Sequence, residues 1–491
     1  MLAAAAAALL LVAALVATPA GPRTRSSFDG DWRFQRGVVV PDTPSSNSTG
    51  CSSGLPCDPT FDASGWRKLT VPHDYVLESP VSQQNKGNGG SFFSQNVSWY
   101  RKAFELPRSA EGRLIWLTLD GVFRAADIYI NGALIKHHEE GYTSWTAYLH
   151  NASSPLRFGV GQTNVVAVFV DSTQPELWCY EGGGIFRHTW LETAGQLSVV
   201  PHGFYAPTLV NGAITGGDAT KEQTTDAAIL LPRLDLQNVG AANVSVTVSF
   251  SLWTRPTDAL DTATLVVSRS RSLTVPSRGF RRVATGPIVF GVDVAPGLSL
   301  VKLWNTALEP PLYTAKAQVR ASSGEVLDAV ETSIGVRSAV FDARLGFLLN
   351  GVKVRMQGTA NHLGFGGVGI AVPDRVQEFQ IANLRKSINT NAWRTAHNPV
   401  SPEFLDYADQ YGLLVWEENR FVTHGVQPMG EPEDEDERRR NLREPRYDGR
   451  SYEAYDTANT TEEADPRLLQ DAQDMVLRDR NHPSIVLWSL W

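Results

Sequence analysis

Hydrophobic and polar residues alternate along much of the chain in the way that is typical of antiparallel β-strands. Between residues 27 and 196, short alternating runs are separated by Gly, Asn and Pro turns, and the clearest runs are residues 114–119 and 164–170. The Asn131-Gly132 turn directly follows another such run, which is a strong hairpin signal. We therefore expect an antiparallel β-sandwich in this region.

A second region of alternating strands covers residues 199–336. Its clearest run is residues 244–250, and its size and turn spacing suggest an immunoglobulin-like β-sandwich. The region contains no Cys, so the inter-sheet disulfide found in many such sandwiches is absent.

After Phe341 the pattern changes to strands that alternate with helices. Four apolar strands are predicted, at residues 354–358, 391–395, 413–416 and 485–488. Two helices are predicted between them: residues 374–388, opened by Pro373 with Val376, Phe379, Leu384 and Ile388 on one side, and residues 402–411, with Ser401 as N-cap and Gly412 after the end.

Repeated strand-helix units with apolar strands predict a parallel sheet covered by helices. A full (β/α)8 barrel needs about 250 residues, and only about 150 lie between Phe341 and Trp491. Half a barrel fits, and an unpaired edge strand is unusual in a finished protein. We therefore expect that the chain is a fragment of a longer protein.

The overall composition favours a soluble protein with an uncharged ligand. Hydrophobic residues make up 42% and charged residues 20% of the chain, and the net charge is −8. Since no sustained basic stretch is present, nucleic acid and anionic membrane surfaces are not expected as partners. The composition does not reveal the oligomeric state.

The N-terminus suggests the secretory route. Residues 1–20 are rich in Ala and Leu and end in small residues, which predicts a signal peptide; an uncleaved anchor or a translated low-complexity leader is the alternative. Cys51 and Cys57 flank a short loop that a disulfide would close in an oxidising compartment. Five Asn-x-Ser/Thr sequons agree with a secreted or lumenal location: Asn47, Asn96, Asn151, Asn243 and Asn459.

Polar residues follow three of the predicted barrel strands. In (β/α) barrels the active site lies at the carboxyl ends of the strands, so these positions are the first candidates for chemistry. The residues are Asn361 and His362 after the first strand, His397 and Asn398 after the second, and Glu417 and Glu418 after the third, with His424 further on. A lone His is more often structural, but several polar clusters at equivalent positions favour a site.

Several motifs then resemble those of glycoside hydrolase family 2, in the order and spacing found in that family. The stretch from Arg394 to Pro399 looks like the motif R-T-S-H-N/Y-P, and residues 479–490 look like the signature that runs on into Asn-Glu. Three stretches resemble the opening and closing segments of the family's jelly-roll domain: Gly30 to Phe34, Val71 to Asp74, and Tyr180 to Arg187.

This resemblance implies a domain order. We expect a signal peptide at residues 1–20, a jelly-roll sugar-binding-like domain at 27–197, an immunoglobulin-like β-sandwich at 198–338, and a partial TIM-barrel catalytic domain at 339–491.

The resemblance also implies a retaining β-glycosidase, which needs two carboxyl groups about 5 Å apart. The acid/base Glu is expected just after Trp491 and the nucleophile further on, so no catalytic residue is expected within the chain and the chain alone should be inactive. Substrate binding is expected from Asn361, His362, Arg394, His397 and Asn398, with Glu417 and Glu418 supporting Arg394. Trp178 and Glu181 either form a lip that faces the substrate or belong to a structural turn.

No cofactor is expected. Several β-galactosidases of the family bind Mg²⁺ through a carboxylate two residues before the His of a T-H-G segment. This chain has Val422 at that position, before Thr423-His424-Gly425, which puts Mg²⁺ dependence in doubt.

The substrate favoured by the resemblance is a terminal β-galactoside. Residues 358–362 and the Gly-rich residues 366–369 look more like β-galactosidases than β-mannosidases. A β-glucuronidase of the same family is one alternative, and a non-catalytic secreted carbohydrate-binding protein is another.

Overall fold

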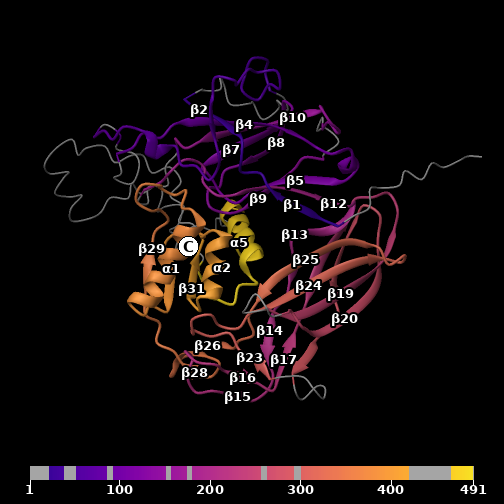
Figure 1. The fold of residues 1–491 in the computed structure, drawn as a ribbon, viewed down its shortest axis with the longest axis vertical. Coiled ribbons are helices and arrows are strands. Elements are labelled where there is room, and N and C mark those ends of the chain that lie inside the picture. The colour runs from indigo at the N-terminus through magenta and orange to yellow at the C-terminus, as the bar shows by residue number, and fades with distance from the viewer. Residues whose placement is uncertain are drawn as a thin grey trace, which may run out of the picture.

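The structure is a computed structural model. It describes residues 22–37, 51–83, 85, 92–150, 156–173, 180–255, 262–291, 300–419 and 466–489 (Figure 1). The expected signal peptide and the sequons at Asn47, Asn151 and Asn459 lie outside these ranges.

The N-terminal part is a β-sandwich of two antiparallel sheets. One sheet has the strand order β1-β12-β5-β9 and the other the order β3-β2-β4-β10-β7-β8. The bounds of the first sheet are β1 Thr24–Ser27, β12 Thr189–Ala194, β5 Leu114–Leu119 and β9 Trp145–Tyr148. Those of the second are β3 Arg67–Leu69, β2 Trp32–Arg36, β4 Val97–Glu105, β10 Thr163–Asp171, β7 Ala125–Ile130 and β8 Ala133–His138.

Apolar side chains from both sheets meet in the core of this first sandwich, among them Trp32, Tyr100, Ile115 and Ile128. A short two-stranded pair, β6 (Val122–Phe123) and β11 (Gly184–Ile185), and two 3-10 turns, η1 (Val76–Glu78) and η2 (Arg108–Ala110), complete it.

Local sequence signals in this sandwich are confirmed. The runs at residues 114–119 and 164–170 form β5 and most of β10. Asn131 and Gly132 take positive φ angles of 47° and 89° between β7 and β8, because the hairpin turn needs left-handed backbone there. The Cys51–Cys57 disulfide is also present, with an S–S distance of 1.92 Å.

The second sandwich follows at once and is antiparallel throughout. Its largest sheet has the order β20-β19-β24-β25, and three smaller sheets have the orders β13-β18-β21, β14-β17-β22 and β15-β16-β23. The bounds are β13 Leu197–Tyr205, β14 Thr208–Val210, β15 Ile214–Thr215, β16 Thr224–Thr225, β17 Ala227–Leu230, β18 Arg233–Asn238, β19 Val244–Thr254, β20 Leu265–Val275, β21 Gly279–Ala284, β22 Ile288–Gly291, β23 Val301–Lys302, β24 Tyr313–Ala321 and β25 Val326–Ile334.

A mainly aliphatic core fills this second sandwich, with Val248, Phe250, Leu236 and Val319 fully buried. The outermost strand of the large sheet, β20, carries the exposed side chains of Arg269 and Arg271. These donate to the carbonyl oxygens of Pro287 (2.8 Å) and Ala284 (2.7 Å).

The C-terminal part contains a four-stranded parallel sheet in the order β29-β30-β31-β32. A small antiparallel sheet precedes it, formed by β26 Ala339–Asp342, β27 Gly346–Leu349 and β28 Val352–Lys353. The parallel strands are β29 Gly358–Asn361, β30 Ala392–Thr395, β31 Leu414–Glu418 and β32 Ile485–Ser489, and the helices are α1 Asp374–Ser387, α2 Pro402–Gln410 and α5 Pro466–Asp479.

The start of the first parallel strand was predicted wrongly. Residues 354–357 lie outside any strand, and β29 begins at Gly358. In this segment the Asn391 side chain bonds to the backbone where a strand would have bonded to its neighbour. Its Oδ1 accepts from the Gln357 amide (2.7 Å), and its Nδ2 donates to the Arg355 carbonyl (2.9 Å).

The predicted apolar face of α1 was wrong at two of its four positions, whereas Leu384 packs against the core. Phe379 and Ile388 are 60% and 63% exposed, whereas the buried positions of the helix are Gln377, Ile381 and Arg385. Long polar side chains occupy this face because they reach backbone carbonyls beneath it; the Arg385 guanidinium donates to the carbonyls of Thr306, Thr390 and Tyr411.

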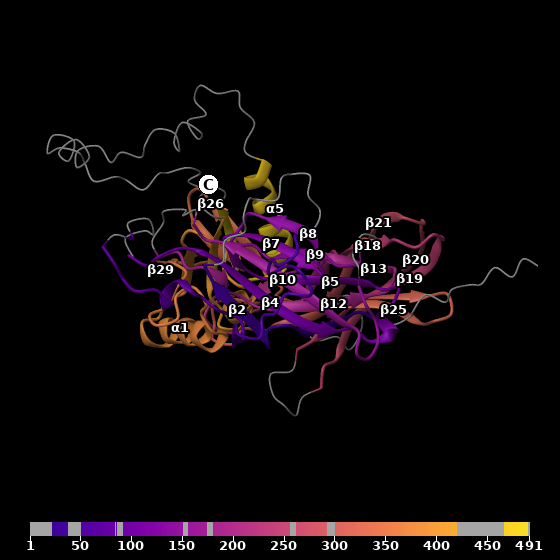
Figure 2. The same ribbon diagram turned by 90° about the horizontal axis from the view of Figure 1, so that it is seen from above.

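The three parts contact one another closely. In Figure 1 the first sandwich lies above, the second sandwich lies below it on the right, and the parallel sheet with its helices lies below it on the left. Seen from above, α1 and the strands β19 and β20 of the second sandwich lie towards opposite ends, and α5 lies between them (Figure 2). Trp304 joins the second sandwich to α2 by donating its indole N–H to the Asp409 carbonyl (2.9 Å). In the part of the chain that the structure describes, no helix is both long and apolar enough to cross a bilayer.

Candidate active site

The carboxyl ends of β29, β30 and β31 lie side by side because the three strands are parallel neighbours. Asn361 pairs with Thr395, and Arg394 pairs with Trp416, so the residues that follow each strand meet at one edge of the sheet. This edge holds most of the polar residues that the sequence singled out.

Glu418 organises the centre of this edge. Its carboxylate is fully buried, and each of its oxygens has a cationic or imidazole partner. Oε1 accepts from Arg394 Nε at 2.5 Å, and Oε2 accepts from His397 Nδ1 at 2.8 Å. The Glu418 amide donates to Thr395 Oγ1 (2.9 Å), which fixes the end of β31 against β30.

This geometry defines the orientation of two side chains. The His397 ring is oriented through its Nδ1 atom, which contacts Glu418 Oε2 at 2.8 Å and lies 3.3 Å from Arg394 Nη2. The Arg394 guanidinium lies 5.0 Å from the centre of the Trp416 ring, a distance typical of a cation–π contact.

His362 lies beside this cluster. Its Nδ1 donates to the Ala396 carbonyl (2.9 Å), and its ring centre is 5.7 Å from that of His397. The two imidazole rings are therefore neighbours. Asn361 and Asn398 line a small cavity with His362, but the Asn361 amide donates to the carbonyl and hydroxyl oxygens of Thr359 (3.1 and 2.8 Å).

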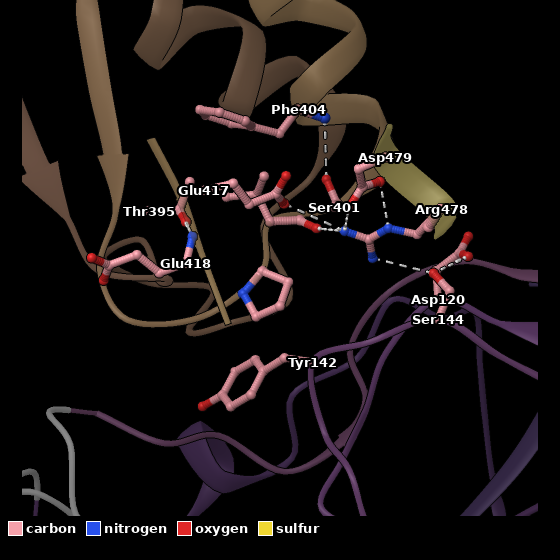
Figure 3. Close-up of polar contacts among 12 residues, drawn as sticks. Asp120, Tyr142, Ser144, Thr395, Ser401, Phe404, Glu417, Glu418, Arg478 and Asp479 are labelled. Atoms are coloured by element: carbon pink, nitrogen blue, oxygen red, sulfur yellow. Dashed lines mark hydrogen bonds and ion pairs between the residues drawn. The ribbon is translucent and has the colours of Figure 1, made fainter. Parts of the chain in front are cut away.

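Glu417 points away from this cluster, contrary to the expectation that it supports Arg394. Figure 3 shows the Glu417 and Glu418 side chains extending to opposite faces of β31. Glu417 is fully buried and faces Arg478, whose Nη2 is 3.8 Å from Glu417 Oε1. Neither Glu417 carboxylate oxygen has a hydrogen-bond partner. Burial, together with the negative charge of Asp479, raises the pKa of Glu417 well above its usual value.

Arg478 is the cation that faces Glu417 on this side of β31. It forms two bonds with the adjacent Asp479, Nε to Oδ1 at 2.6 Å and Nη2 to Oδ2 at 2.7 Å (Figure 3). It also donates to Ser144 Oγ of the first sandwich (3.3 Å) and to the Val400 carbonyl (2.6 Å). The sequence analysis missed Arg478, although its place directly before the D-R-N-H-P segment could have drawn attention to it.

The two candidates from the closing loop of the first sandwich have separate outcomes. Trp178 lies outside the described residues. Glu181 is only 1% exposed and lies where the first sandwich packs near the parallel sheet, so its position fits the structural-turn alternative better than a substrate-facing lip.

The expected T-H-G segment with Val422 and His424 lies outside the described residues. Two other groups within the described part bring together side chains of the types that bind metals: His188, Asp374 and Glu403, and Asp406, Asp409 and His482. In the first group His188 Nδ1 donates to Asp29 Oδ2 (2.7 Å). The hydrogen bonds to Asp29 and Asp374 raise the pKa of His188 to about 10. In each group the imidazole forms ion pairs, His188 with Asp29 and Asp374 and His482 with Asp409.

Comparison with known proteins agrees with this arrangement. Two family models match the chain: "Glycosyl hydrolases family 2" at residues 218–337 and "Glycosyl hydrolases family 2, TIM barrel domain" at residues 342–491. The chain belongs to glycoside hydrolase family 2. The family reading made from the sequence is thus confirmed, as is the combination of sandwich domains with a TIM-barrel type of C-terminal domain.

Curated relatives of this family 2 chain include proteins named beta-galactosidase and proteins named beta-glucuronidase. A protein named beta-galactosidase BoGH2A from Bacteroides ovatus is 30% identical over 472 residues, which are 96% of this chain and 46% of that protein. A putative beta-glucuronidase from Formosa agariphila is 25% identical over 470 residues, 95% of this chain and 37% of that protein. The chain thus spans less than half the length of these two relatives.

Solved structures show the same fold. A glycosyl hydrolase family 2 member from Bacteroides cellulosilyticus superposes with a TM-score of 0.72 at 25% identity, covering 94% of this chain and 51% of that one. Beta-glucuronidase 2 from Bacteroides uniformis superposes with a TM-score of 0.69 at 21% identity, covering 95% and 46% of the two chains.

Proposed function

We propose that the protein is a retaining β-glycosidase that hydrolyses terminal β-galactosides. The observation that carries this proposal is the cluster of Arg394, His397 and Glu418 at the carboxyl ends of parallel strands, with His362 beside it. In (β/α) barrels this is the edge where substrates bind. A cation and two imidazoles held in fixed orientations suit the recognition of sugar hydroxyl groups.

The reaction itself needs a nucleophilic carboxylate and a second carboxyl group that protonates the leaving oxygen. Glu418 is not suited to either task, since both of its oxygens are engaged by Arg394 and His397. Glu417 lies on the opposite face of the strand. We therefore assign the catalytic pair to carboxyl groups other than Glu417 and Glu418, and assign substrate positioning to the cluster around Glu418.

The finer architecture belongs to the same proposal. We take the first sandwich as the family's jelly-roll domain, the second as its immunoglobulin-like domain, and the parallel sheet as the first half of a (β/α)8 barrel. The match to a TIM-barrel family model supports the last assignment. We also propose that the protein is secreted, that it binds a carbohydrate and that it uses no cofactor.

The substrate is proposed as a galactoside rather than a glucuronide. The relative that is 30% identical carries the name beta-galactosidase, whereas those named beta-glucuronidases are 25% identical or less. A glucuronide carries a carboxylate that would require an additional cation near the sugar.

The deciding experiment compares nitrophenyl β-galactoside with nitrophenyl β-glucuronide as substrates of the protein encoded by the complete transcript. We expect release of nitrophenol from the galactoside. Preference for the glucuronide would replace the proposed substrate. Tight sugar binding without hydrolysis of either would favour a non-catalytic carbohydrate-binding protein.

Residues 1–491 alone provide a second test. We expect no turnover from them, because the chemistry requires two carboxyl groups and neither Glu417 nor Glu418 is placed to act as one. Steady-state hydrolysis by this segment would contradict the placement of the catalytic pair.

A further inference from the structure

Two buried charged side chains of the first sandwich reach the loops that carry His362 and His397. We propose that Asp74 and Arg187 are positioning residues, which hold the loops after β29 and β30 so that the imidazole rings of the two histidines lie next to each other. This inference rests on the proposed function only for the identity of the ligand that these rings would contact.

Asp74 connects three segments of the chain. Its Oδ1 accepts from the amides of Val76 (3.1 Å) and Gly183 (3.0 Å). Its Oδ2 accepts from the Tyr180 hydroxyl (2.8 Å) and from the amide of Ile370 (3.0 Å), which lies in the loop that follows His362. Asp74 is only 6% exposed, so water contacts its carboxylate little. The four donors supply the hydrogen bonds that water would otherwise make.

The backbone approaches Asp74 so closely that two positions have no room for a side chain. A Cβ atom would lie 2.3 Å from Asp74 Oδ2 at Gly182 and 2.1 Å from it at Gly369. Gly369 also has a φ of +63°, which other residues rarely adopt. One glycine belongs to the sandwich and the other to the loop after β29, so both sides of this contact are shaped around the carboxylate.

Arg187 makes the corresponding contact to the second loop. Its Nη2 donates to the Pro399 carbonyl (2.7 Å), two residues after His397, and its Nη1 donates to the Tyr142 carbonyl of the sandwich (2.6 Å). The side chain is 4% exposed. Burial and the nearby Arg478 charge lower the pKa of Arg187 to about 9, so the guanidinium remains protonated at neutral pH.

Apolar contacts support the two polar ones. Phe123, Tyr142 and Phe186 of the sandwich pack in one cluster with Ile370 and Ala371 of the loop after β29. The loops are also joined to each other, since His362 Nδ1 donates to the Ala396 carbonyl. The sandwich thus holds one loop through an anion and the next through a cation.

The Asp74→Asn variant tests the first contact selectively. An amide nitrogen in place of Oδ2 can face the Tyr180 hydroxyl, which can turn to accept, but it cannot accept the Ile370 N–H. In the full-length protein we expect hydrogen exchange at Ile370 to rise about tenfold or more, while β-strand amides of the sandwich core stay within about threefold. The matched control is Asp31→Asn, at an exposed carboxylate of the same sandwich.

The Arg187→Met variant tests the second contact. It removes both donors while keeping much of the apolar stem, and we expect faster exchange at residues 396–398. Arg344→Met, at an exposed arginine, is its control.

A spectroscopic readout separates positioning from simple stabilisation. With ¹⁵N-labelled histidine, both variants should shift the imidazole signals of His362 and His397 and leave those of His482 unchanged. Lower melting temperature with unchanged His362 and His397 signals would mean that the two residues only stabilise the fold, and would overturn the inference.

These measurements need no substrate, so they are independent of the proposed function. If the exchange and imidazole shifts appear but the protein hydrolyses no glycoside, the positioning role stands and the proposed function fails. If hydrolysis is observed and neither loop responds, the proposed function stands and the positioning role fails.

Discussion

The two faces of β31 place neighbouring carboxylates in contrasting surroundings. On the open face, Glu418 accepts from Arg394 and His397 and has no unsatisfied oxygen. On the face covered by helices, Glu417 has neither oxygen bonded and lies 3.8 Å from the nearest Arg478 nitrogen. Both side chains have zero exposure.

The difference teaches that burial alone does not define a site. Successive strand residues point to opposite faces, so adjacent identical residues meet different chemistry. Glu418 is buried together with partners that its charge orients, whereas Glu417 is buried where its charge is hard to accommodate. A pair of acidic residues in sequence is therefore no evidence of a pair in function.

The largest effect is expected on the covered face, from Arg478→Met. The substitution leaves Glu417 and Asp479 buried without their shared cation, which should lower the free energy of unfolding by about 4 kcal/mol. Urea unfolding followed by pulse proteolysis would measure it, with Arg344→Met as the control. A loss below about 1 kcal/mol would indicate that the two carboxyl groups already share a proton and need no cation.

On the open face we expect a smaller effect from Glu418→Gln. The amide oxygen can still accept from one of the two partners, but the amide nitrogen cannot accept from the other, so one hydrogen bond and the carboxylate charge are lost. Because the Arg394 side chain is 29% exposed and water can solvate it, the loss should be about 2 kcal/mol. The same unfolding assay applies. A loss as large as that of Arg478→Met would show that the two faces are energetically alike.

The smallest expected effect is a dependence of the free energy of unfolding on pH, caused by Glu417. Its pKa is raised in the folded state, so the stability it contributes is present below its unfolded pKa and is lost as the pH rises toward the folded value. Between the unfolded and the folded pKa, the free energy of unfolding of Glu417→Gln should therefore rise relative to that of the unsubstituted protein. The difference should grow by up to about 1.4 kcal/mol for each pH unit. Unfolding midpoints at about pH 5, 6 and 7 would reveal it; parallel pH curves would mean that the Glu417 pKa is ordinary.

Much of the fold was predictable because its signals are local. The Asn131-Gly132 hairpin and the Ser401 N-cap, which accepts from the Phe404 amide at 3.2 Å, depend on a few adjacent residues. The errors arose where distant residues decide. Val354 and Met356 pack against the cluster around Trp304 instead of extending β29, and α5 was missed because Asp471 and Asp479 occupy its buried positions beside Ala472 and Met475.

The candidate site was predictable to the same extent. Strand order explains why His362, Arg394, His397 and Glu418 meet, since the ends of parallel neighbours share an edge. No sequence pattern shows that Glu417 faces Arg478 or that Asp74 reaches the Ile370 amide 296 positions later. The first contact depends on how α5 packs against β31, and the second on how the sandwich packs against the loop after β29.

The outermost strand β20 has a consequence for the behaviour of the protein at high concentration. A long edge strand is a template on which another copy can add a strand and begin an aggregate. Arg269 and Arg271 place two positive charges along this edge, and their side chains donate to the carbonyl of Pro287, which follows β21, and to that of Ala284 at the end of β21. An approaching copy would meet like charge at its own β20, so edge-to-edge growth between identical molecules is disfavoured. Replacing both arginines would remove that protection without touching the core.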